Sequence, residues 1–250
     1  MRRIKIIVSY DGTEYHGWQV QPGLPTIQAA LEQAISEIEG RQVQVAGSGR
    51  TDAGVHALAQ TAAFSIANPI PVDNLQRAMN RLLPRDIRVL SAGEAAPDFH
   101  PRFQARRKTY EYRMFRGEIC SPFERRYVYH HPYPLAMEEM IAAAPLLAGE
   151  HDFTAFAASD ERDALEQSKV RTIFCSRLAL EGERGNRLTY RVTGSGFLKH
   201  MVRNIVGVLL EVGKGNLDRA GILARLEPGC AIPAGPTAPA RGLFLMSVEY

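Results

Sequence analysis

The feature that most restricts the fold of this chain is a repeated order of strand and helix patterns in its two halves. In the first half, apolar residues alternate through 3–10, a period of two that predicts a strand. A helix with one apolar face follows, between a capping Thr26 and a terminating Gly40. Strand and helix patterns then alternate in a similar order in both halves. We therefore expect an α+β fold of two related α/β domains with mainly antiparallel sheets.

The remaining elements follow from the same two periods. Alternating or continuous apolar runs bounded by Gly or Pro mark strands, whereas a period of 3.6 marks helices. Asp73 is expected to cap the second helix, which stops before Pro84. The helix at 197–212 has an expected buried stripe of Leu198, Met201, Val202, Ile205, Leu209 and Val212. The expected strands are 3–10, a short one at Val43 and Val45, 56–66, 87–93, 108–115, 170–181, 187–194 and 243–250; the expected helices are 27–39, 73–82, 135–147, 197–212 and 217–226.

Length and composition place the chain among ordinary globular proteins. It has 250 residues, of which 45% are hydrophobic and 23% charged, and these values exclude a disordered chain. The seam between the domains is expected near 95–106, which gives domains of 1–100 and 101–250. A membrane-spanning helix needs roughly 20 consecutive apolar residues, but the longest apolar runs are broken by Gly207, Glu211 and Pro145.

The cysteines and the N-terminal residues bear on the compartment. Cys120, Cys175 and Cys230 are odd in number and have no CxxC spacing. Such a set favours free thiols in a reducing compartment over a disulfide framework or a thiolate zinc site. The opening MRRIKIIVSYDG lacks the apolar run and cleavage site of a signal peptide. We therefore expect a cytoplasmic location.

Positive charge is concentrated although the net charge is only +3. Between 102 and 116 there are six basic residues and one acid, Glu111, with aromatic residues interleaved. Cations attract phosphates and flat rings stack on unpaired bases, so this stretch predicts a nucleic-acid surface, with a solvated strand face as the alternative. The interleaved aromatics are Phe103, Tyr110, Tyr112 and Phe115; a second basic cluster consists of Arg77, Arg81, Arg85 and Arg88, with only Asp86 against it.

The stretch GSGRTDAGVHA, residues 47–57, is the most informative motif. Its three glycines allow a tight turn, and Arg50 and Asp52 lie two residues apart within it. A carboxylate on a glycine-rich loop between strands is well placed for catalysis. The alternative is a turn in which Asp52 only accepts backbone N–H bonds. The glycines do not lead from a strand into a helix, and no Lys-Ser pair follows, which argues against a dinucleotide site or a P-loop.

GRTDAGVHA resembles the signature of the anticodon-arm tRNA pseudouridine synthases, the tRNA pseudouridine synthase A family. Further blocks resemble that family in the expected order and extend over nearly the whole chain. They are YDGTEYHGWQ, DFHPRFQARRKTYEYRMF, GEHDFTAF, GSGFLKHMVRNIVG with LLEVGKG, and TAPARGLFL. The resemblance implies a pseudouridine synthase fold with a basic cleft between two α/β domains. It also implies a homodimer that acts on the tRNA anticodon arm, at tRNA nucleotides 38–40, without cofactor or metal.

The resemblance also implies roles for individual residues. Asp52 matches the catalytic aspartate and Tyr110 the tyrosine that stacks on the target uracil. Arg203 matches the arginine that pairs with this aspartate. In the same way Arg50 matches an RNA-contacting arginine and Leu243 a leucine that lines the pocket. From residue spacing alone, Tyr110 is a core tyrosine on the same strand face as Tyr112, and Arg203 lies on the polar side of an amphipathic helix. A carboxylate in this reaction attacks the base at C6, attacks the sugar at C1′, or removes a sugar proton to give a glycal, and the residue pattern leaves these routes open.

Two other functions are set against the isomerase. One is a catalytically idle RNA-binding module on the same basic surface, against which the presence of Asp52, Tyr110 and Arg203 argues. The other is a metal-dependent hydrolase. The seven histidines contain no HxxxH or HExxH pair, which argues against that function. His56 and His200 are interpreted as ordinary hydrogen-bonded residues, with a place near the site as the alternative.

Overall fold

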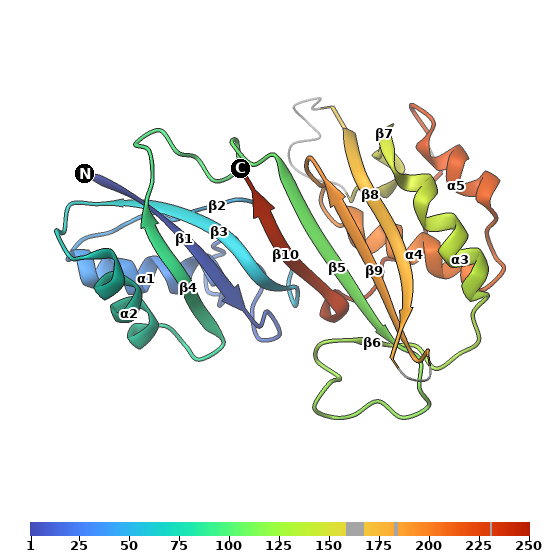
Figure 1. Ribbon diagram of the computed structural model, residues 1–250, viewed down its shortest axis with the longest axis horizontal. Helices are drawn as coiled ribbons and strands as arrows, with labels where there is room; N and C mark the ends of the chain where they lie inside the picture. Colours follow the sequence, from blue (N-terminus) through green and yellow to red (C-terminus); the bar gives the residue numbers. More distant parts are fainter. Residues whose placement is uncertain (159–167, 183–184, 231) are drawn as a thin grey trace. The chain divides into compact units, whose positions relative to one another are not determined.

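The protein divides into two compact units. A computed structural model describes residues 1–158, 168–182, 185–230 and 232–250 (Figure 1). Unit 1 consists of Met1–Arg106 with Phe244–Tyr250, and unit 2 of Arg107–Leu243. The C-terminal strand belongs with unit 1 because Phe244 and Leu245 pair in parallel with the start of β3. The sequence predicts two contiguous domains divided at residue 100. The structure differs because the C-terminal strand returns to unit 1.

Unit 1 is built on a sheet with the strand order β4-β1-β3-β10. β1 is antiparallel to both β3 and β4, and its expected alternation is confirmed, because Ile4, Ile6 and Val8 are fully buried. The two helices lie next to each other against this sheet (Figure 1). The elements are β1 (Arg2–Tyr10), α1 (Ile27–Glu39), β2 (Ala46–Gly47), β3 (His56–Ile66), α2 (Val72–Leu82), β4 (Ile87–Glu94) and β10 (Leu243–Glu249).

Unit 2 has an antiparallel sheet with the strand order β5-β9-β8-β7, and its helices gather beside that sheet (Figure 1). Together the two sheets confirm the expected α+β class with mainly antiparallel pairing. The elements are β5 (Arg107–Phe115), β6 (Tyr129–His130), α3 (Met137–Ala143), η1 (Ala144–Leu147), β7 (Gly149–Asp152), η2 (Thr154–Phe156), β8 (Val170–Glu181), β9 (Arg187–Gly194), α4 (Met201–Gly213), α5 (Arg219–Leu226) and η4 (Ala240–Gly242).

The ends of α1 follow the sequence signals, whereas the start of α2 does not. The Thr26 side chain caps α1 by accepting from the Ala29 backbone N–H, and Gly40 ends the helix with a φ of 75°. The capping role predicted for Asp73 is wrong. α2 begins at Val72 after Pro71, and Asp73 lies inside the first turn, where its charge favours the positive end of the helix dipole.

The strand predicted around Val43 and Val45 is also wrong, and two side chains of α1 explain why. The Val43 N–H donates to Ser36 Oγ and the Val45 N–H donates to Glu32 Oε1, each at 2.9 Å. These side chains take the donors that a sheet ladder would use. The paired strand is β2, which lies just beyond at Ala46–Gly47.

Three helices of unit 2 are shorter than predicted. The helix expected at 135–147 is α3, which passes into the 3₁₀ turn η1 where Pro145 removes a backbone donor. The helix expected at 197–212 begins only at Met201, because His200 adopts a left-handed backbone with φ 60°. α5 begins at Arg219 behind an Asp218 cap.

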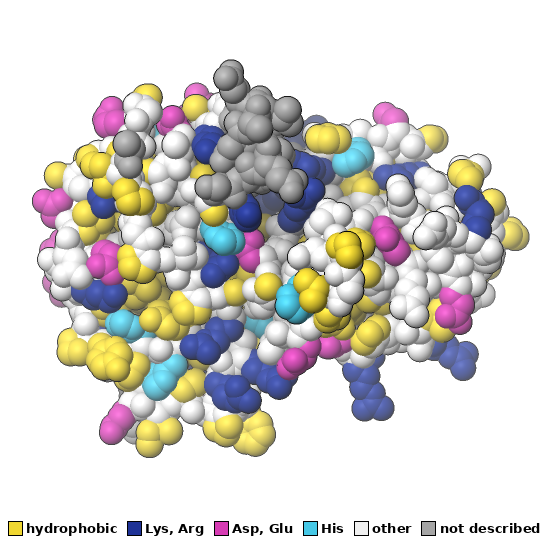
Figure 2. Space-filling view, turned by 180° about the vertical axis from the view of Figure 1, so that it is seen from behind, with side chains coloured by type: hydrophobic (Ala, Val, Ile, Leu, Met, Phe, Trp, Pro, Cys, Tyr) yellow, Lys and Arg dark blue, Asp and Glu magenta, His cyan; other side chains and the backbone are white. Residues whose placement is uncertain are grey.

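The surface is mixed in charge. The face shown in Figure 2 carries both Lys or Arg and Asp or Glu side chains. Among the helices of the described ranges, none has the length and apolar character needed to cross a bilayer.

Candidate active site

The GRTD loop joins β2 to β3 in unit 1, and the segment 10–19 holds it in place. The Trp18 N–H donates to the Thr51 carbonyl at 3.0 Å, and the Gly54 N–H donates to the Tyr15 carbonyl at 3.3 Å. Within the loop, the Val55 N–H closes a turn on the Asp52 carbonyl at 3.1 Å. The backbone on both sides of Asp52 is therefore fixed, and its side chain is half-buried at the bend.

Two glycines of the segment 10–19 allow this close approach. A Cβ at Gly12 would lie 2.0 Å from the Val55 carbonyl oxygen, and a Cβ at Gly17 would lie 2.4 Å from the Thr51 carbonyl oxygen. Real Cβ atoms do not come so close to backbone oxygen, so the position of the loop depends on glycine at both places. This is the physical reason that YDGTEYHGWQ accompanies GRTDAGVHA in one sequence.

Side chains fix the entry to the loop as well. Ser48 Oγ bonds to Gln60 Oε1 at 2.5 Å, and Gln60 Nε2 donates to the Gly49 carbonyl at 2.8 Å. Both Ser48 and Gln60 are fully buried. Arg50 is exposed, and its Nε donates to Gln19 Oε1 at 3.2 Å. A polar frame therefore holds the loop with Arg50 at the surface and Asp52 beside it.

The hydroxyl of Tyr10 contributes a bond that can be tested directly. It lies 2.9 Å from Thr51 Oγ1, and both side chains are buried. Tyr10→Phe leaves the Thr51 hydroxyl without this partner, so we expect it to lower the free energy of unfolding by about 1 kcal/mol. Denaturant unfolding of Tyr10→Phe, Thr51→Val and the double variant completes the cycle. Additive losses would show that the two hydroxyls are not energetically coupled.

Tyr110 lies on β5 of unit 2 and is largely buried. Its exposed fraction is 7%, and its ring meets Phe197 edge to face with centroids 5.1 Å apart. The next tyrosine along the strand, Tyr112, is fully buried and donates its hydroxyl to the Pro239 carbonyl at 2.8 Å. Burial raises the pKa of the Tyr112 hydroxyl, which keeps it a proton donor in this bond.

Three of the four aromatic residues of the basic stretch are buried, whereas the sequence indicates an exposed stacking surface. Tyr110, Tyr112 and Phe115 are buried, whereas Phe103 is 76% exposed. Tyr112 packs inside unit 2 and offers no open ring face, whereas Tyr110 and Phe115 each keep a small part of their surface exposed. Phe103 alone of the four presents a ring to solvent, stacked beside His100 with centroids 4.3 Å apart.

Glu111 ties up part of the positive charge. It accepts from Arg113 Nε at 2.8 Å and from Arg191 Nη2 at 2.5 Å, and only 6% of the residue is exposed. Burial raises the pKa of the Glu111 carboxyl, but the two arginine hydrogen bonds outweigh burial and hold the pKa below its ordinary value. Because neighbouring residues of a strand point to opposite faces, this carboxylate faces away from Tyr110.

Arg203 lies in the first turn of α4, which is buried on nearly every side. All residues of the helix other than Arg203 and Glu211 are buried, so Arg203 does not belong to the polar face of an amphipathic helix. Its Nε donates to the Ala238 carbonyl at 2.8 Å, and its own carbonyl accepts from the Ala238 N–H at 3.2 Å. This reciprocal pair fixes the plane of the guanidinium.

A second pair of side chains locks the same segment to α4. Thr237 Oγ1 donates to Asn204 Oδ1 at 2.6 Å, and Asn204 Nδ2 donates to the Phe156 carbonyl at 2.8 Å. Leu243, 5% exposed, follows at the end of this stretch. The TAPARG residues therefore act as a brace for the MVRN helix, and they lead directly into Leu243.

His56, one of the two histidines with an alternative place near the site, lies at the start of β3. His56 is buried and stacks on Phe244 with centroids 4.7 Å apart. Its Nδ1 lies 3.1 Å from both the Gly12 backbone N and Asp11 Oδ1. His56 therefore ties the start of β3 to the segment 10–19, as an ordinary hydrogen-bonded residue does. Within the described ranges, no group of three His, Cys, Asp or Glu side chains is placed to hold a metal ion.

Comparison with known proteins assigns the chain to a family. Residues 6–104 and 143–250 match the family model described as tRNA pseudouridine synthase. The chain belongs to the tRNA pseudouridine synthase family. It is 64% identical, over the full length of both chains, to tRNA pseudouridine synthase A of Solibacter usitatus. It is 45% identical to the protein of the same name from Anoxybacillus flavithermus and 42% identical to the one from Latilactobacillus sakei. Each comparison covers all of this chain and 99% of the relative.

The candidate residues fall into two groups within this pseudouridine synthase. Arg50 and Asp52 share the GRTD loop of unit 1, whereas Tyr110, Arg203 and Leu243 belong to unit 2. The matched ranges contain all of these residues except Tyr110. Residue patterns in the sequence do not indicate a supporting role for Tyr10, Gln60 or Ala238. The glycines of YDGTEYHGWQ are the signal that indicates a close backbone approach in that segment.

Proposed function

We propose that this chain isomerises uridine to pseudouridine in the anticodon stem-loop of tRNA, at tRNA nucleotides 38–40. Family membership over the whole chain is the observation that carries this proposal. The braced loop around Asp52 supports it, because a catalytic carboxylate needs a fixed backbone. We also propose that it acts as a homodimer in the cytoplasm and without a cofactor.

The reaction needs no second substrate. The N1–C1′ glycosidic bond breaks, the uracil turns, and C5 bonds to C1′; the hydrogen on C5 leaves as a proton and N1 gains one. Atoms and electrons therefore balance within the nucleotide. Since a stacked base is inaccessible, the target uridine must leave the stem and enter a pocket.

The candidate residues take distinct parts in this reaction. Asp52 is the catalytic carboxylate, and it serves as a nucleophile or a base only when ionised. Tyr110 stacks on the flipped uracil, a contact worth about 1–3 kcal/mol. Arg203 pairs with Asp52 and favours its ionised form. Arg50 contacts RNA, and Leu243 lines the pocket that receives the base.

The test follows tritium release from C5 of uridine in a labelled tRNA transcript. Formation of the C5–C1′ bond ejects this hydrogen, so a module that only binds RNA produces no signal. We expect release by the wild-type protein, unchanged by a chelator. Release that a chelator abolishes would favour a metal-dependent enzyme. No release across a full set of tRNAs, with tRNA still bound, would establish the idle RNA-binding module instead.

A further inference from the structure

We infer that three arginines of unit 1 form a binding strip for the phosphate backbone of the tRNA substrate. The α2 arginine strip consists of Arg77 and Arg81 on α2 and Arg85 in the turn that follows. It rests on the proposed function for the identity of the RNA. The proposed function assigns no role to these three arginines. The strip gives the enzyme a second contact with the tRNA, away from the GRTD loop.

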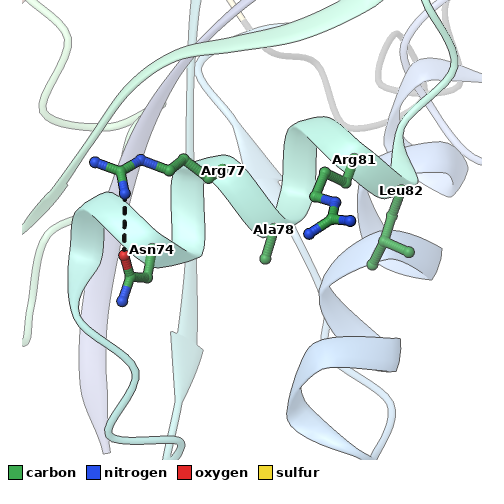
Figure 3. A pocket seen from close by; sticks show the side chains of 5 residues that line it. All are labelled: Asn74, Arg77, Ala78, Arg81 and Leu82. Atoms are coloured by element: carbon green, nitrogen blue, oxygen red, sulfur yellow. Dashed lines mark hydrogen bonds between the residues drawn. The ribbon is translucent and has the colours of Figure 1, made fainter.

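All three arginines are exposed, and Arg77 and Arg81 lie on one side of α2. Arg77 and Arg81 are four residues apart, a spacing that places their side chains about 5–6 Å from each other at Cβ. Together with Asn74, Ala78 and Leu82 they line a shallow hollow of about 410 Å³ (Figure 3). Arg77 Nη1 donates to Asn74 Oδ1 at 3.5 Å, the dashed line in Figure 3.

The charge of this strip is largely uncompensated, unlike that of four surface arginines that form ion pairs. Elsewhere the side chains of Arg2, Arg41, Arg187 and Arg219 pair with carboxylates. The side chains of Arg81 and Arg85 have no hydrogen bond or ion pair with any residue that the structure describes. Asp73 is one turn before Arg77 but forms no ion pair with it in the described part of the chain. Guanidinium groups in this state are suited to bind phosphate.

Arg88 differs from the three residues of the strip. Its Nη1 donates to the carbonyls of Pro84 and Ile87, each at 2.6 Å. It therefore holds the turn after α2 in shape. Of the four arginines that are close together in the sequence, Arg88 has a structural role and the three of the strip face outward.

The helix beneath Arg77 and Arg81 is held rigidly, so the backbone that carries these side chains is fixed. Leu75 and Met79 are fully buried. Asn80 exchanges two hydrogen bonds of 2.8 Å with the backbone of Val89, and Gln76 Nε2 donates to the Leu90 carbonyl at 2.8 Å. A side-chain array on a fixed helix loses less entropy on binding than one on a mobile loop.

The strip leads toward the end of the sheet that carries the GRTD loop. Tyr10 at the end of β1 pairs with Ala57 near the start of β3 and with Ile87 at the start of β4. The GRTD loop and the turn after α2 are therefore at the same end of this sheet. Asp86 in that turn accepts from Tyr15 Oη at 2.8 Å, and the Tyr15 carbonyl accepts from Gly54 of the loop. When the target base of an RNA reaches the GRTD loop, the neighbouring phosphate backbone can therefore extend along α2.

The experiment compares two triple variants of equal charge. Arg77→Gln/Arg81→Gln/Arg85→Gln removes the strip, and Arg41→Gln/Arg187→Gln/Arg219→Gln removes three arginines that pair with acids. Affinity for an unmodified tRNA transcript is measured by filter binding over a range of salt concentrations. For the strip variant we expect Kd to rise about tenfold at 0.1 M salt, and the slope of log Kd against log salt to fall by about 2 to 3.

Two further readouts separate this strip from catalysis and from folding. The single-turnover rate at saturating tRNA and the midpoint of thermal unfolding should match those of the wild type, because the side chains are exposed and lie outside the GRTD loop. An unchanged Kd and salt slope would overturn the inference, as would an equal loss of affinity in the control triple variant. The affinity measurement gives a result even if the wild-type protein releases no tritium. A failure of the proposed function can therefore be distinguished from a failure of this inference.

Discussion

Replacing Asp52 by asparagine is expected to lower the rate of tritium release at least about a thousandfold. Asparagine has the size of aspartate and keeps an acceptor oxygen, but it is uncharged and cannot serve as the nucleophile or base. The Asp52 carbonyl, which accepts from Val55, is retained in the variant. The loop should therefore keep its conformation, and the loss reports on the carboxylate itself.

The controls for Asp52→Asn separate chemistry from binding and folding. Kd for tRNA and the unfolding midpoint should stay within experimental error of the wild type. Asp98→Asn removes another carboxylate of the same unit, one that is exposed and lies outside the loop, and it should retain full activity. Normal release by Asp52→Asn would remove Asp52 from the chemistry while leaving the isomerase activity in place.

Elements bounded by local signals could be predicted from the sequence, and elements that depend on distant side chains could not. β3 was predicted with its observed bounds because glycines precede it and prolines follow it. The strand predicted around Val43 does not form because Ser36 and Glu32 of α1 accept the backbone N–H bonds of Val43 and Val45. The late start of α4 depends on a left-handed His200, a conformation that no pattern of apolar residues encodes.

The same distinction applies to the candidate site. Asp52 stands in a glycine-rich loop, a position that suits catalysis but equally a plain turn, so its role, like that of Arg203, required the family resemblance. Residue spacing gave Arg203 the appearance of a surface residue on an amphipathic helix. Its actual setting depends on Ala238, whose backbone supplies both the donor and the acceptor. Any residue type can supply backbone donors and acceptors of this kind, so the sequence does not reveal such a partner.

Gly207→Ala is expected to lower the free energy of unfolding by about 2–3 kcal/mol and to reduce activity further than that loss alone explains. A Cβ at residue 207 would lie 1.9 Å from the Pro236 carbonyl oxygen. The obstructing atom belongs to the backbone, so the segment after Pro236 must move off α4. This movement breaks the reciprocal bonds between Arg203 and Ala238 and lets the guanidinium turn.

Gly221→Ala on α5 provides the matched control, since there the nearest obstructing atom is the flexible end of the Leu217 side chain, 2.4 Å away. Alanine is favoured over glycine inside a helix by about 1 kcal/mol, so this variant should be as stable as the wild type or more so. Denaturant unfolding gives the stabilities, and tritium release well below both unfolding midpoints gives the activities. Equal stability and activity for the two variants would mean that the 236–239 segment does not fix Arg203. A less stable and less active Gly207→Ala beside an unaffected Gly221→Ala would identify the contact between α4 and this segment as the support of the arginine.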